Sequence, residues 1–505
     1  MDTVVQERLS TKIQKAVRKT MKYIVDEHDV RARRFLPRND LESILNKKRL
    51  EQLFRELLSN EYASDTATAI PTGSDTGSAE GHDSSIEIDS AVDTCVKATI
   101  GTGNVSRRAL LALFLYQPHT RLLSLYVEWL TSGHPRIRKP SYDDHEIPCD
   151  KSIPFTEGDL ETLNIPFTNH GYIMDYQTIF TPMTIRKFTH HDFKTRDRLP
   201  FLGAKEKIKD GSSGTVYKTN IAPGHWEFKT SDGRFLPENP DTSMVVALKI
   251  FKTIEGPWGT RDAKEVETDF NIERELLDSL RKRNISHRMI MLHWGSFSVR
   301  DADGIPSYHA LIFELATFSL EAFLKDEECY RIFTDKSPVL AGLVDIVEAL
   351  HCLHEHLGFF HLDIKPENIL VFVEPESVHS GSNHEEGRKL IWKLSDFGLA
   401  REKGSTRERT GHRLSSSYYS SQPSTLPATR PAGLYQAPEI QSSSSSQAGP
   451  GSDVWSMGCV ILMVLASIIE GPEGVTDLSS KLEVFFLNAA GKQKLFYVRN
   501  DSHSW

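Results

Sequence analysis

Cysteine, net positive charge and long apolar runs are all scarce in this sequence. The 505 residues include only five cysteines, an odd number spread far apart, which is typical of reduced thiols and not of a disulfide framework. Lys and Arg total 60 against 69 Asp and Glu, and the net charge of -9 gives the whole chain no electrostatic reason to bind nucleic acid or an anionic membrane. The longest apolar run, Cys459 to Ile469, reaches about half of the roughly 20 residues that a membrane helix needs. The charged start of the chain also lacks the apolar core of a signal peptide.

These absences predict an intracellular protein, cytoplasmic or nuclear, with no membrane insertion and no specific nucleic-acid partner. What is present argues for a folded protein of several parts. Hydrophobic residues make up 39% of the chain and aromatic residues 9%, which excludes disorder of the whole chain. The length predicts roughly three domains.

The first 195 residues differ in composition from one part to the next. Residues 1–62 are rich in helix formers, with apolar residues at near-helical spacing between Leu41 and Leu58, so we expect an N-terminal helical region. Residues 63–93 shift to Ser, Thr, Gly, Asp and Ala with almost no aromatic residues, which predicts a disordered linker. Residues 94–195 begin with apolar helical patterns and continue with proline-punctuated segments, which predicts a helical and then irregular region.

A glycine-containing stretch further along is suited to phosphate. Ile208–Tyr217 has small residues between two β-prone flanks, which predicts a strand, a turn and a second strand. Backbone N–H groups near Gly211 and Gly214 would then approach phosphate oxygens without a Cβ in the way. An ordinary β-hairpin is the other interpretation of this pattern.

A lysine lies in the next strand pattern. Val245–Phe251 has the composition of a buried strand and contains Lys249, and an unpaired buried ammonium group is costly. The helical segment Phe270–Leu277 supplies a counter-charge in Glu273, whose leucine pair three and four residues later lies on the same face. We therefore expect an ion pair between Lys249 and Glu273.

Polar and apolar residues alternate from His361 to Val371 in a way that neither a simple strand nor a helix explains, which indicates a functional loop. Asp363 is suited to orient an attacking hydroxyl and accept its proton, and Lys365 to neutralise a transferring phosphoryl group. Asn368 is suited to ligate a divalent cation. Asp396 follows a strand-like segment and precedes a glycine, a placement that suits Mg²⁺.

These motifs and their order along the chain resemble those of the eukaryotic protein kinase family. The resemblance extends from Leu202 to about Gly471. The Lys365-Pro366-Glu367-Asn368 form resembles the serine/threonine subgroup. More loosely, the helical region and Phe35-Leu36-Pro37 resemble kinase-like proteins of filamentous fungi with a helical domain before the kinase. The matching segments are Lys209 to Val216, Val246 to Lys249, Glu273, His361 to Asn368, Asp396 to Gly398, Ala437 to Glu439 and Asp453 to Gly458.

The resemblance implies an α+β, two-lobed protein kinase fold over residues 196–505, with a β-rich N-lobe to about residue 317 and a helical C-lobe. It implies ATP and Mg²⁺ as cofactors and an unidentified protein substrate phosphorylated on Ser or Thr. The implied catalytic residues are Asp363, Lys365, Lys249 and Glu273, and the implied metal ligands are Asn368 and Asp396. Phe313 resembles the gatekeeper before the hinge. The implied nucleotide-binding residues are Gly211, Gly214, Val216, Ala247, Lys249, Glu314, Ala316 and Leu370.

The sequence departs from the family pattern in four places. Lys209 replaces the usual first glycine of the loop, and Leu362 replaces an arginine, so phosphate on the activation segment would lack that partner. Pro431-Ala432 replaces the threonine that braces the catalytic loop. The chain after Gly458 is too short for all the later helices of the family, so we expect a truncated C-lobe in which Glu439 lacks its arginine.

Four interpretations follow from these departures and from two further patterns. An uncovered helix would expose Leu462, Val464 and Leu465 and lead to low stability or self-association, unless the sequence is that of a shortened gene product. The alternative to an enzyme is a pseudokinase that binds nucleotide as a scaffold. A metal box is suggested by His351, Cys352, His354 and His356, but we expect a helix end with surface histidines. The Ser-rich stretch 404–430 is either a mobile loop or a phosphorylation site.

Overall fold

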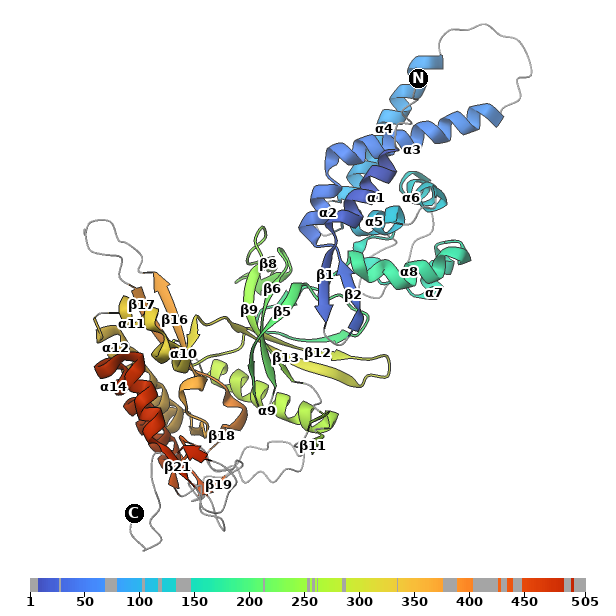
Figure 1. Ribbon diagram of the computed structural model, residues 1–505. Coiled ribbons are helices and arrows are strands. Elements are labelled where there is room, and N and C mark those ends of the chain that lie inside the picture. The colour runs from blue at the N-terminus through green and yellow to red at the C-terminus, as the bar shows by residue number, and fades with distance from the viewer. Residues whose placement is uncertain are drawn as a thin grey trace, which may run out of the picture. The chain divides into compact units, whose positions relative to one another are not determined.

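A computed structural model of the chain describes residues 8–26, 29–68, 80–101, 105–116, 120–132, 147–211, 214–251, 255–256, 259–260, 262–283, 288–333, 335–375, 388–402, 426–427, 434–438, 447–485 and 492–494. The chain divides into two compact units (Figure 1). Unit 1 comprises Met1–Lys209, Tyr217–Val246 and Phe297–Ser307, and unit 2 comprises Asp210–Val216, Ala247–Ser296 and Tyr308–Trp505. All the residues that the sequence marks for catalysis and nucleotide binding belong to unit 2.

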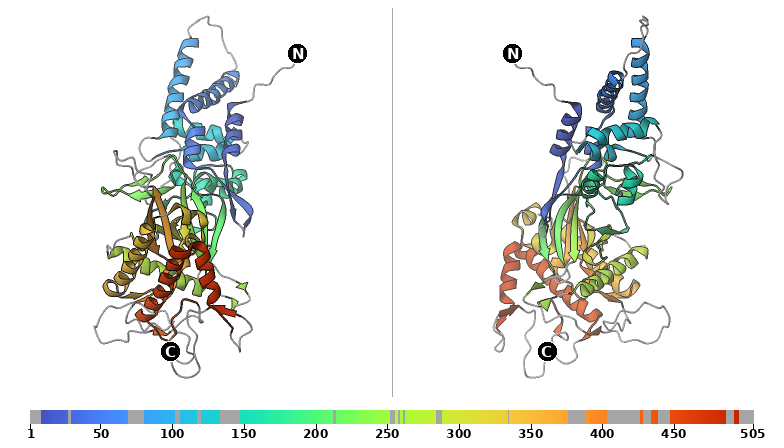
Figure 2. Two further views of the ribbon diagram at one scale, coloured as in Figure 1. Left: turned by 60° about the vertical axis from the view of Figure 1, so that its left-hand side comes forward. Right: turned by 90° about the vertical axis from the view of Figure 1, so that its right-hand side faces the viewer.

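Unit 1 consists mainly of helices that share one apolar core. In α5 (Arg108–Tyr116) every residue from Ala109 to Leu115 is buried, because the helix is apolar on all sides and other helices enclose it. The helices α3 (Lys47–Thr68) and α4 (Glu80–Ile100) lie side by side (Figure 2). The remaining helices are α1 (Leu9–Thr20), α2 (Arg38–Ile44), α6 (Thr120–Ser132), α7 (Glu157–Thr162) and α8 (Phe167–Phe180).

The predicted disordered linker is wrong at both ends. Residues 63–68 belong to α3 and residues 80–93 belong to α4, while 69–79 lie outside the described residues. Aromatic residues are lacking there, but aliphatic residues at helical spacing replace them. Val92, Cys95 and Val96 of α4 are buried in the core of unit 1, and this burial offsets the cost of ordering the helix.

The predicted N-terminal helical region also contains a β-hairpin, and the predicted irregular connector contains α7 and α8. β1 (Lys22–Asp26) pairs with β2 (Asp29–Phe35) in antiparallel orientation and with β5 (Phe201–Asp210) in parallel orientation. A strand that pairs with a segment so distant in sequence leaves little trace in local spacing. The other strands with residues in unit 1 are β3 (Ile185–Arg186), β4 (His190–Lys194), β6 (Thr215–Ile221), β7 (Trp226–Lys229), β8 (Phe235–Pro237), β12 (Gly295–Arg300) and the first residues of β9 (Met244–Phe251) and β13 (Pro306–Glu314).

In unit 2, α9 packs on the strand that carries the predicted lysine. β9 (Met244–Phe251) and β13 (Pro306–Glu314) are neighbours in a sheet, and α9 spans Ala263–Lys282. The helix begins at Asp262, whose carboxylate accepts a hydrogen bond from Glu265 N at 2.7 Å and so satisfies one of the first N–H groups. Phe251 and Phe270 lie edge to face, with ring centroids 5.5 Å apart, and join helix to strand.

Gly342 allows the helix α12 (Ser337–His351) to pack closely on the pair of strands β16 (Ile369–Pro375) and β17 (Arg388–Leu394). The strand β16 pairs with β17, and α12 packs on β17. A Cβ on Gly342 would lie 2.6 Å from the ring of Trp392, so a larger residue would displace the ring. The neighbouring elements are β14 (Phe318–Ser319), α10 (Leu320–Lys325), α11 (Glu327–Ile332) and a π-helical turn (Cys352–His356).

The last long helix, α14 (Pro450–Lys481), is broken near its middle. Gly471 has φ 71° and ψ −161°, so the first helical part ends at Glu470. By length and composition, α14 and the stretch Ser337–His356 would be long and apolar enough to cross a membrane. Both bury side chains in the core of unit 2, as core helices do, so this property is weak evidence for a membrane span.

The predicted apolar face of α14 is only partly exposed. Leu462 and Leu465 are 51% and 37% exposed, whereas Val464 is buried in the core of unit 2, so its predicted exposure is wrong. The reason is helical periodicity, because Val464 projects from a different side of α14 than Leu462 does.

Candidate active site

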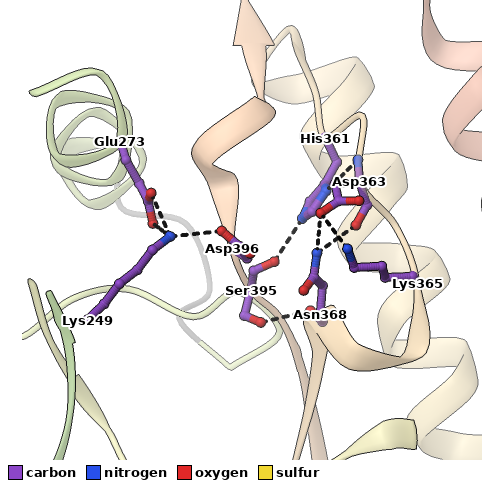
Figure 3. Close-up of polar contacts among 8 residues, drawn as sticks. All are labelled: Lys249, Glu273, His361, Asp363, Lys365, Asn368, Ser395 and Asp396. Atoms are coloured by element: carbon purple, nitrogen blue, oxygen red, sulfur yellow. Dashed lines mark hydrogen bonds and ion pairs between the residues drawn. The ribbon is translucent and has the colours of Figure 1, made fainter. Parts of the chain in front are cut away.

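A buried ammonium group lies between two carboxylates in unit 2 (Figure 3). Lys249 Nζ, on β9, donates to both carboxylate oxygens of Glu273, on α9, at 2.8 Å each. It also donates to Asp396 Oδ1 at 2.8 Å. The exposed fractions of these side chains are 7% for Lys249, 1% for Glu273 and 29% for Asp396. The structure thus places the predicted partner next to Lys249 and adds a second one that was not predicted.

The carboxylates decide the charge of this lysine. Burial alone lowers the pKa of Lys249, but the charges of Asp396 and Glu273 outweigh burial and hold that pKa well above its usual range. Burial raises the pKa of Glu273, and Lys249 opposes that rise. With both Glu273 oxygens 2.8 Å from the ammonium nitrogen, the two groups form an ion pair at neutral pH.

The pairing of β16 with β17 brings the segment before β16 next to the segment after β17. Ile369 is opposite Leu394, so the residue before β16 meets the residue after β17. Ser395 donates to Asn368 O through its backbone nitrogen at 2.9 Å and through its hydroxyl at 2.8 Å. Nε2 of His361 lies 3.1 Å from Ser395 O, which ties the start of the loop to the same point.

Two side chains hold the carboxylate of Asp363. Asn368 Nδ2 donates to Asp363 Oδ2 at 2.7 Å and to the Asp363 backbone oxygen at 2.9 Å. Lys365 Nζ lies 3.1 Å from the same Oδ2 (Figure 3). The predicted loop residues therefore lie within hydrogen-bonding distance of one another, and the orientation of the Asp363 carboxylate is fixed.

A residue of α14 anchors the start of this loop. The carboxylate of Asp453 is 1% exposed and accepts hydrogen bonds from His361 N at 2.8 Å and Leu362 N at 2.7 Å. Leu362 has a φ of 63°, rare for a branched residue, which accompanies the turn that directs both N–H groups at one carboxylate. The sequence predicts no role for Asp453, although an acidic residue at the start of an apolar helix indicates a functional contact.

His354 contacts the same carboxylate. Its Nε2 lies 2.9 Å from Asp453 Oδ2 and its side chain is 9% exposed. The prediction of surface histidines is therefore wrong for His354, because the helix end packs against α14, while His351 and His356 are exposed.

The oxygens of Asn368 and Asp396 fit the predicted magnesium ion. Asn368 directs its amide nitrogen at Asp363, so its carbonyl oxygen faces elsewhere (Figure 3). Asp396 follows β17 with a φ of 63°. Mg²⁺ prefers carboxylate and amide oxygens, and it usually takes few ligands from the protein and the rest from phosphates and water. Within the described residues, no group of three or more His, Cys, Asp and Glu forms a self-sufficient metal site.

The glycine-containing turn lies where the sequence predicts it. Gly211 N donates to Gly214 O at 2.8 Å, and β5 and β6 flank the turn. A Cβ on Gly214 would lie 2.4 Å from the carbonyl oxygen of Ile250 on β9, so only glycine allows this approach. Residues 212–213 lie outside the described residues.

The predicted adenine-binding residues are brought together in part. Ala316 and Leu370 pack in one apolar cluster with Phe313, which also contacts the larger core of unit 2. Val216, on β6, and Ala247, on β9, are not members of this cluster. Glu314, at the end of β13, forms an ion pair of 2.7 Å with Lys393 on β17, which fixes the segment between β13 and β14.

A cavity of about 370 Å³ adjoins Asp363. Its walls come from the catalytic loop, from α10, from residues 434–436 and from α14. The lining residues are Glu321, Leu324, Lys325, Asp363, Lys365, Pro366, Glu367, Leu434, Tyr435, Gln436, Met463, Val475 and Ser479.

Several predictions concern residues that the structure does not describe. Pro431-Ala432, Glu439 and most of 404–430 lie outside the described residues. The statements about the missing threonine, the missing arginine partner and phosphorylation therefore stay predictions.

Comparison with known families agrees with this geometry. Residues 236–472 match the family model of the protein kinase domain. The matched segment contains Lys249, Glu273, Asp363, Asn368 and Asp396. The chain therefore carries a protein kinase domain at residues 236–472, within an α+β structure that also has an N-terminal helical region.

The curated relatives are distant serine/threonine kinases. Cyclin-dependent kinase 7 of Xenopus laevis is 25% identical over 292 residues, 58% of this chain and 62% of that protein. Cyclin-dependent kinase 7 of Caenorhabditis elegans is 28% identical over 251 residues, 50% of this chain and 61% of that protein. Serine/threonine-protein kinase ICK of Rattus norvegicus is 31% identical over 153 residues, 30% of this chain and 18% of that protein. The chain thus spans less than two thirds of the length of these relatives.

Proposed function

We propose that this protein transfers the γ-phosphate of ATP to serine or threonine hydroxyls of a protein substrate, with Mg²⁺ as cofactor. The observation that carries the proposal is the Asp363 carboxylate, held by Asn368 and Lys365, in the same unit as the buried pair of Lys249 and Glu273. Phosphoryl transfer needs positioning and charge neutralisation more than covalent chemistry, and these groups supply both. The serine/threonine choice rests on the Lys365-Pro366-Glu367-Asn368 sequence and on the name of the relative serine/threonine-protein kinase ICK.

Asp363 acts as the base in this mechanism. Its carboxylate orients the substrate hydroxyl and takes the proton as the hydroxyl oxygen bonds to the γ-phosphorus. The bond from that phosphorus to the bridging oxygen breaks, and ADP keeps the electron pair. Lys365, whose ammonium lies 3.1 Å from Asp363 Oδ2, neutralises charge on the transferred group. The adjoining cavity gives room for residues of the substrate next to the hydroxyl.

The other residues hold the nucleotide. Lys249, kept in place by Glu273, neutralises the non-transferred phosphates, and the turn at Gly211 to Gly214 covers them. Asn368 and Asp396 would hold Mg²⁺, and the ion would supply positive charge that neutralises the phosphates. The Ala316 and Leu370 cluster supplies an apolar surface for adenine.

One assay tests the proposal. Purified protein, incubated with Mg-ATP labelled at the γ-phosphate and a generic basic protein, should phosphorylate Ser and Thr and no Tyr. Asp363→Asn should reduce transfer to background while the thermal shift caused by Mg-ATP persists. Asp396→Asn should weaken that thermal shift as well, because it removes a ligand of the metal.

Comparison of the wild type with Asp363→Asn separates the enzyme from the alternative, a nucleotide-binding scaffold. If the wild-type protein binds Mg-ATP but never exceeds the rate of Asp363→Asn, the enzyme proposal is wrong and the protein is a nucleotide-binding scaffold. If the wild-type protein shows neither transfer nor a thermal shift, both proposals are wrong.

The proposal also concerns the location of the protein in the cell and its self-association. All five cysteines are free thiols, which supports an intracellular location, in the cytoplasm or the nucleus. The exposed residues Leu462 and Leu465 of α14 support self-association through this helix. The resemblance to kinase-like proteins of filamentous fungi stays a prediction from the sequence.

A further inference from the structure

A buried histidine lies beside α9 without a role in the site described above. His293 is 2% exposed, and its Nε2 lies 3.0 Å from Asp278 Oδ1 on α9. Its ring meets the ring of Phe313 edge to face, with centroids 6.5 Å apart. Nδ1 of His293 has no hydrogen-bond partner among the residues that the structure describes. The backbone of Gly295 also interacts with this imidazole, and a buried imidazole in such surroundings is a group that a change of protonation would disturb.

The short segment around His293 joins the two strands that border the site. Met291 N donates to Leu394 O at 2.8 Å, and Leu394 N donates to Met289 O at 3.0 Å, so the segment is bonded to the end of β17. Trp294 N donates to Ile312 O at 2.6 Å, which bonds it to β13. Asp396 lies two residues after the end of β17, and so the segment is fixed to the strand that precedes this carboxylate.

The third connection of the segment is to α9. Asp278 lies about one and a half turns after Glu273 on this helix. Arg281 Nη1 donates to Asp278 Oδ1 at 2.8 Å, and Arg281 Nη2 also donates to the backbone oxygen of His293. These bonds are the polar links that fasten the C-terminal half of α9 to the His293 segment. Glu273 is bonded to Lys249 only while α9 stays at its position next to the strands.

We propose that the hydrogen bond between His293 and Asp278 is a pH-sensitive latch that holds α9 in place. While the latch is closed, Glu273 stays within reach of Lys249. Acid opens it, α9 loosens, and the ion pair at the site is lost. His293 is thus a positioning residue that acts through α9. The effect on turnover rests on the proposed kinase function, whereas the effect on α9 does not.

The charges around His293 set the direction of the pH dependence. On α9 they are the carboxylate of Asp278 and the guanidinium group of Arg281, while Arg274 acts on Asp278, and β13 contributes the uncharged ring of Phe313. Burial lowers the pKa of His293, Asp278 opposes this and Arg281 adds to it, so the net shift is downward. Protonation would add a second buried N–H at Nδ1, next to a cation.

The sign follows from the lowered pKa. The unfolded or detached histidine binds its proton near pH 6.5, while the latched histidine does so only at lower pH. The latch is therefore fully stable above about pH 6.5 and loses stability as the pH falls below it.

The test compares two substitutions of this histidine in the full chain. His293→Gln keeps a donor near the position of Nε2 but does not titrate, and His293→Leu keeps the apolar volume without a donor. At pH 7.5, His293→Gln should keep kcat within about two-fold, and His293→Leu should lower it about ten-fold with little change in KM for ATP. Between pH 7.5 and 5.5 the wild type should lose activity faster than His293→Gln.

The matched control is another buried histidine. His225 of unit 1 is 1% exposed, and burial lowers its pKa to about 4. His225→Gln should change stability but leave kcat and the shape of the pH profile of the wild type. An equal effect of His225→Gln and His293→Gln on the pH profile would contradict the latch.

A readout that does not depend on catalysis separates the latch from the proposed function. Hydrogen exchange of α9 peptides, corrected for intrinsic rates, should rise several-fold in the wild type between pH 7.5 and 5.5 and stay constant in His293→Gln. If the wild type transfers no phosphate but α9 exchange behaves in this way, the kinase proposal fails and the latch stands. If α9 exchange in the wild type does not respond to acid, the latch is wrong, whether or not the variants fold.

Discussion

The buried pair of Lys249 and Glu273 gives the sharpest stability prediction. Lys249→Met removes the ammonium group and leaves a carboxylate that is 1% exposed facing Asp396. Removing one partner of a buried ion pair costs about 3–5 kcal/mol, because the other charge is left uncompensated. In Lys249→Met/Glu273→Gln the remaining group is a neutral amide, and we expect it to recover about 2 kcal/mol of that loss. The measurement is urea unfolding of the four proteins of this double-mutant cycle.

The pH dependence of the same variant has a definite sign. Without Lys249, burial and the charge of Asp396 both raise the pKa of Glu273. A raised pKa in the folded state contributes stability below the unfolded value of about 4.3, and this contribution is lost as the pH rises through the folded value. The deficit of Lys249→Met relative to the wild type should therefore shrink from pH 7.5 to pH 5.

The surface supplies a matched control for this prediction. Lys325 pairs with Glu321 at 2.7 Å on α10, but the two side chains are 49% and 41% exposed. Lys325→Met should cost less than about 0.5 kcal/mol, because exposed ion pairs of this kind contribute little. If Lys325→Met and Lys249→Met cost the same, or if the cycle is additive, the reasoning from burial is refuted.

Three further predictions concern other parts of unit 2. Asp453→Asn removes the anionic acceptor of two backbone N–H groups of the catalytic loop, so kcat should fall at least ten-fold while the thermal shift with ATP persists, as turnover and binding assays will show. Gly214→Ala places a methyl group 2.4 Å from the Ile250 carbonyl oxygen, and we expect a destabilisation of about 1–3 kcal/mol in urea unfolding and weaker ATP binding, whereas an unchanged midpoint would contradict it. Leu462→Glu combined with Ile469→Glu, at residues 51% and 73% exposed, should reduce self-association in sedimentation velocity without lowering the melting temperature.

Local chemistry could be predicted from the sequence where one residue demands another. A lysine in a buried strand needs a counter-charge, and Glu273 met that need at the position where helical spacing put it. The same reasoning assigned Asp363, Lys365 and Asn368 to one loop, because all three lie within six residues of one another. These contacts are short in sequence or forced by the cost of burial.

Contacts that depend on distant segments could not be predicted in this way. Asp453 bonds to Leu362 across 91 residues, and no spacing rule connects them. The β1–β2 hairpin pairs with β5, so its strands form because of a partner and not because of local composition. The linker prediction failed for the opposite reason, since composition alone ignored the burial of Val92 in a core formed by other helices.

The anchoring of the catalytic loop by Asp453 has a consequence for the order of folding during synthesis. The backbone N–H groups of His361 and Leu362 have their acceptor 92 and 91 residues further along the chain. A ribosome-bound chain that ends before α14 lacks this acceptor, and the loop cannot take up the backbone conformation that it has in the finished protein. Nucleotide-binding strands and α9 emerge long before the base is in place. Under the proposed function, ATP binding would therefore precede phosphoryl transfer during synthesis, and transfer would begin only after α14 has docked.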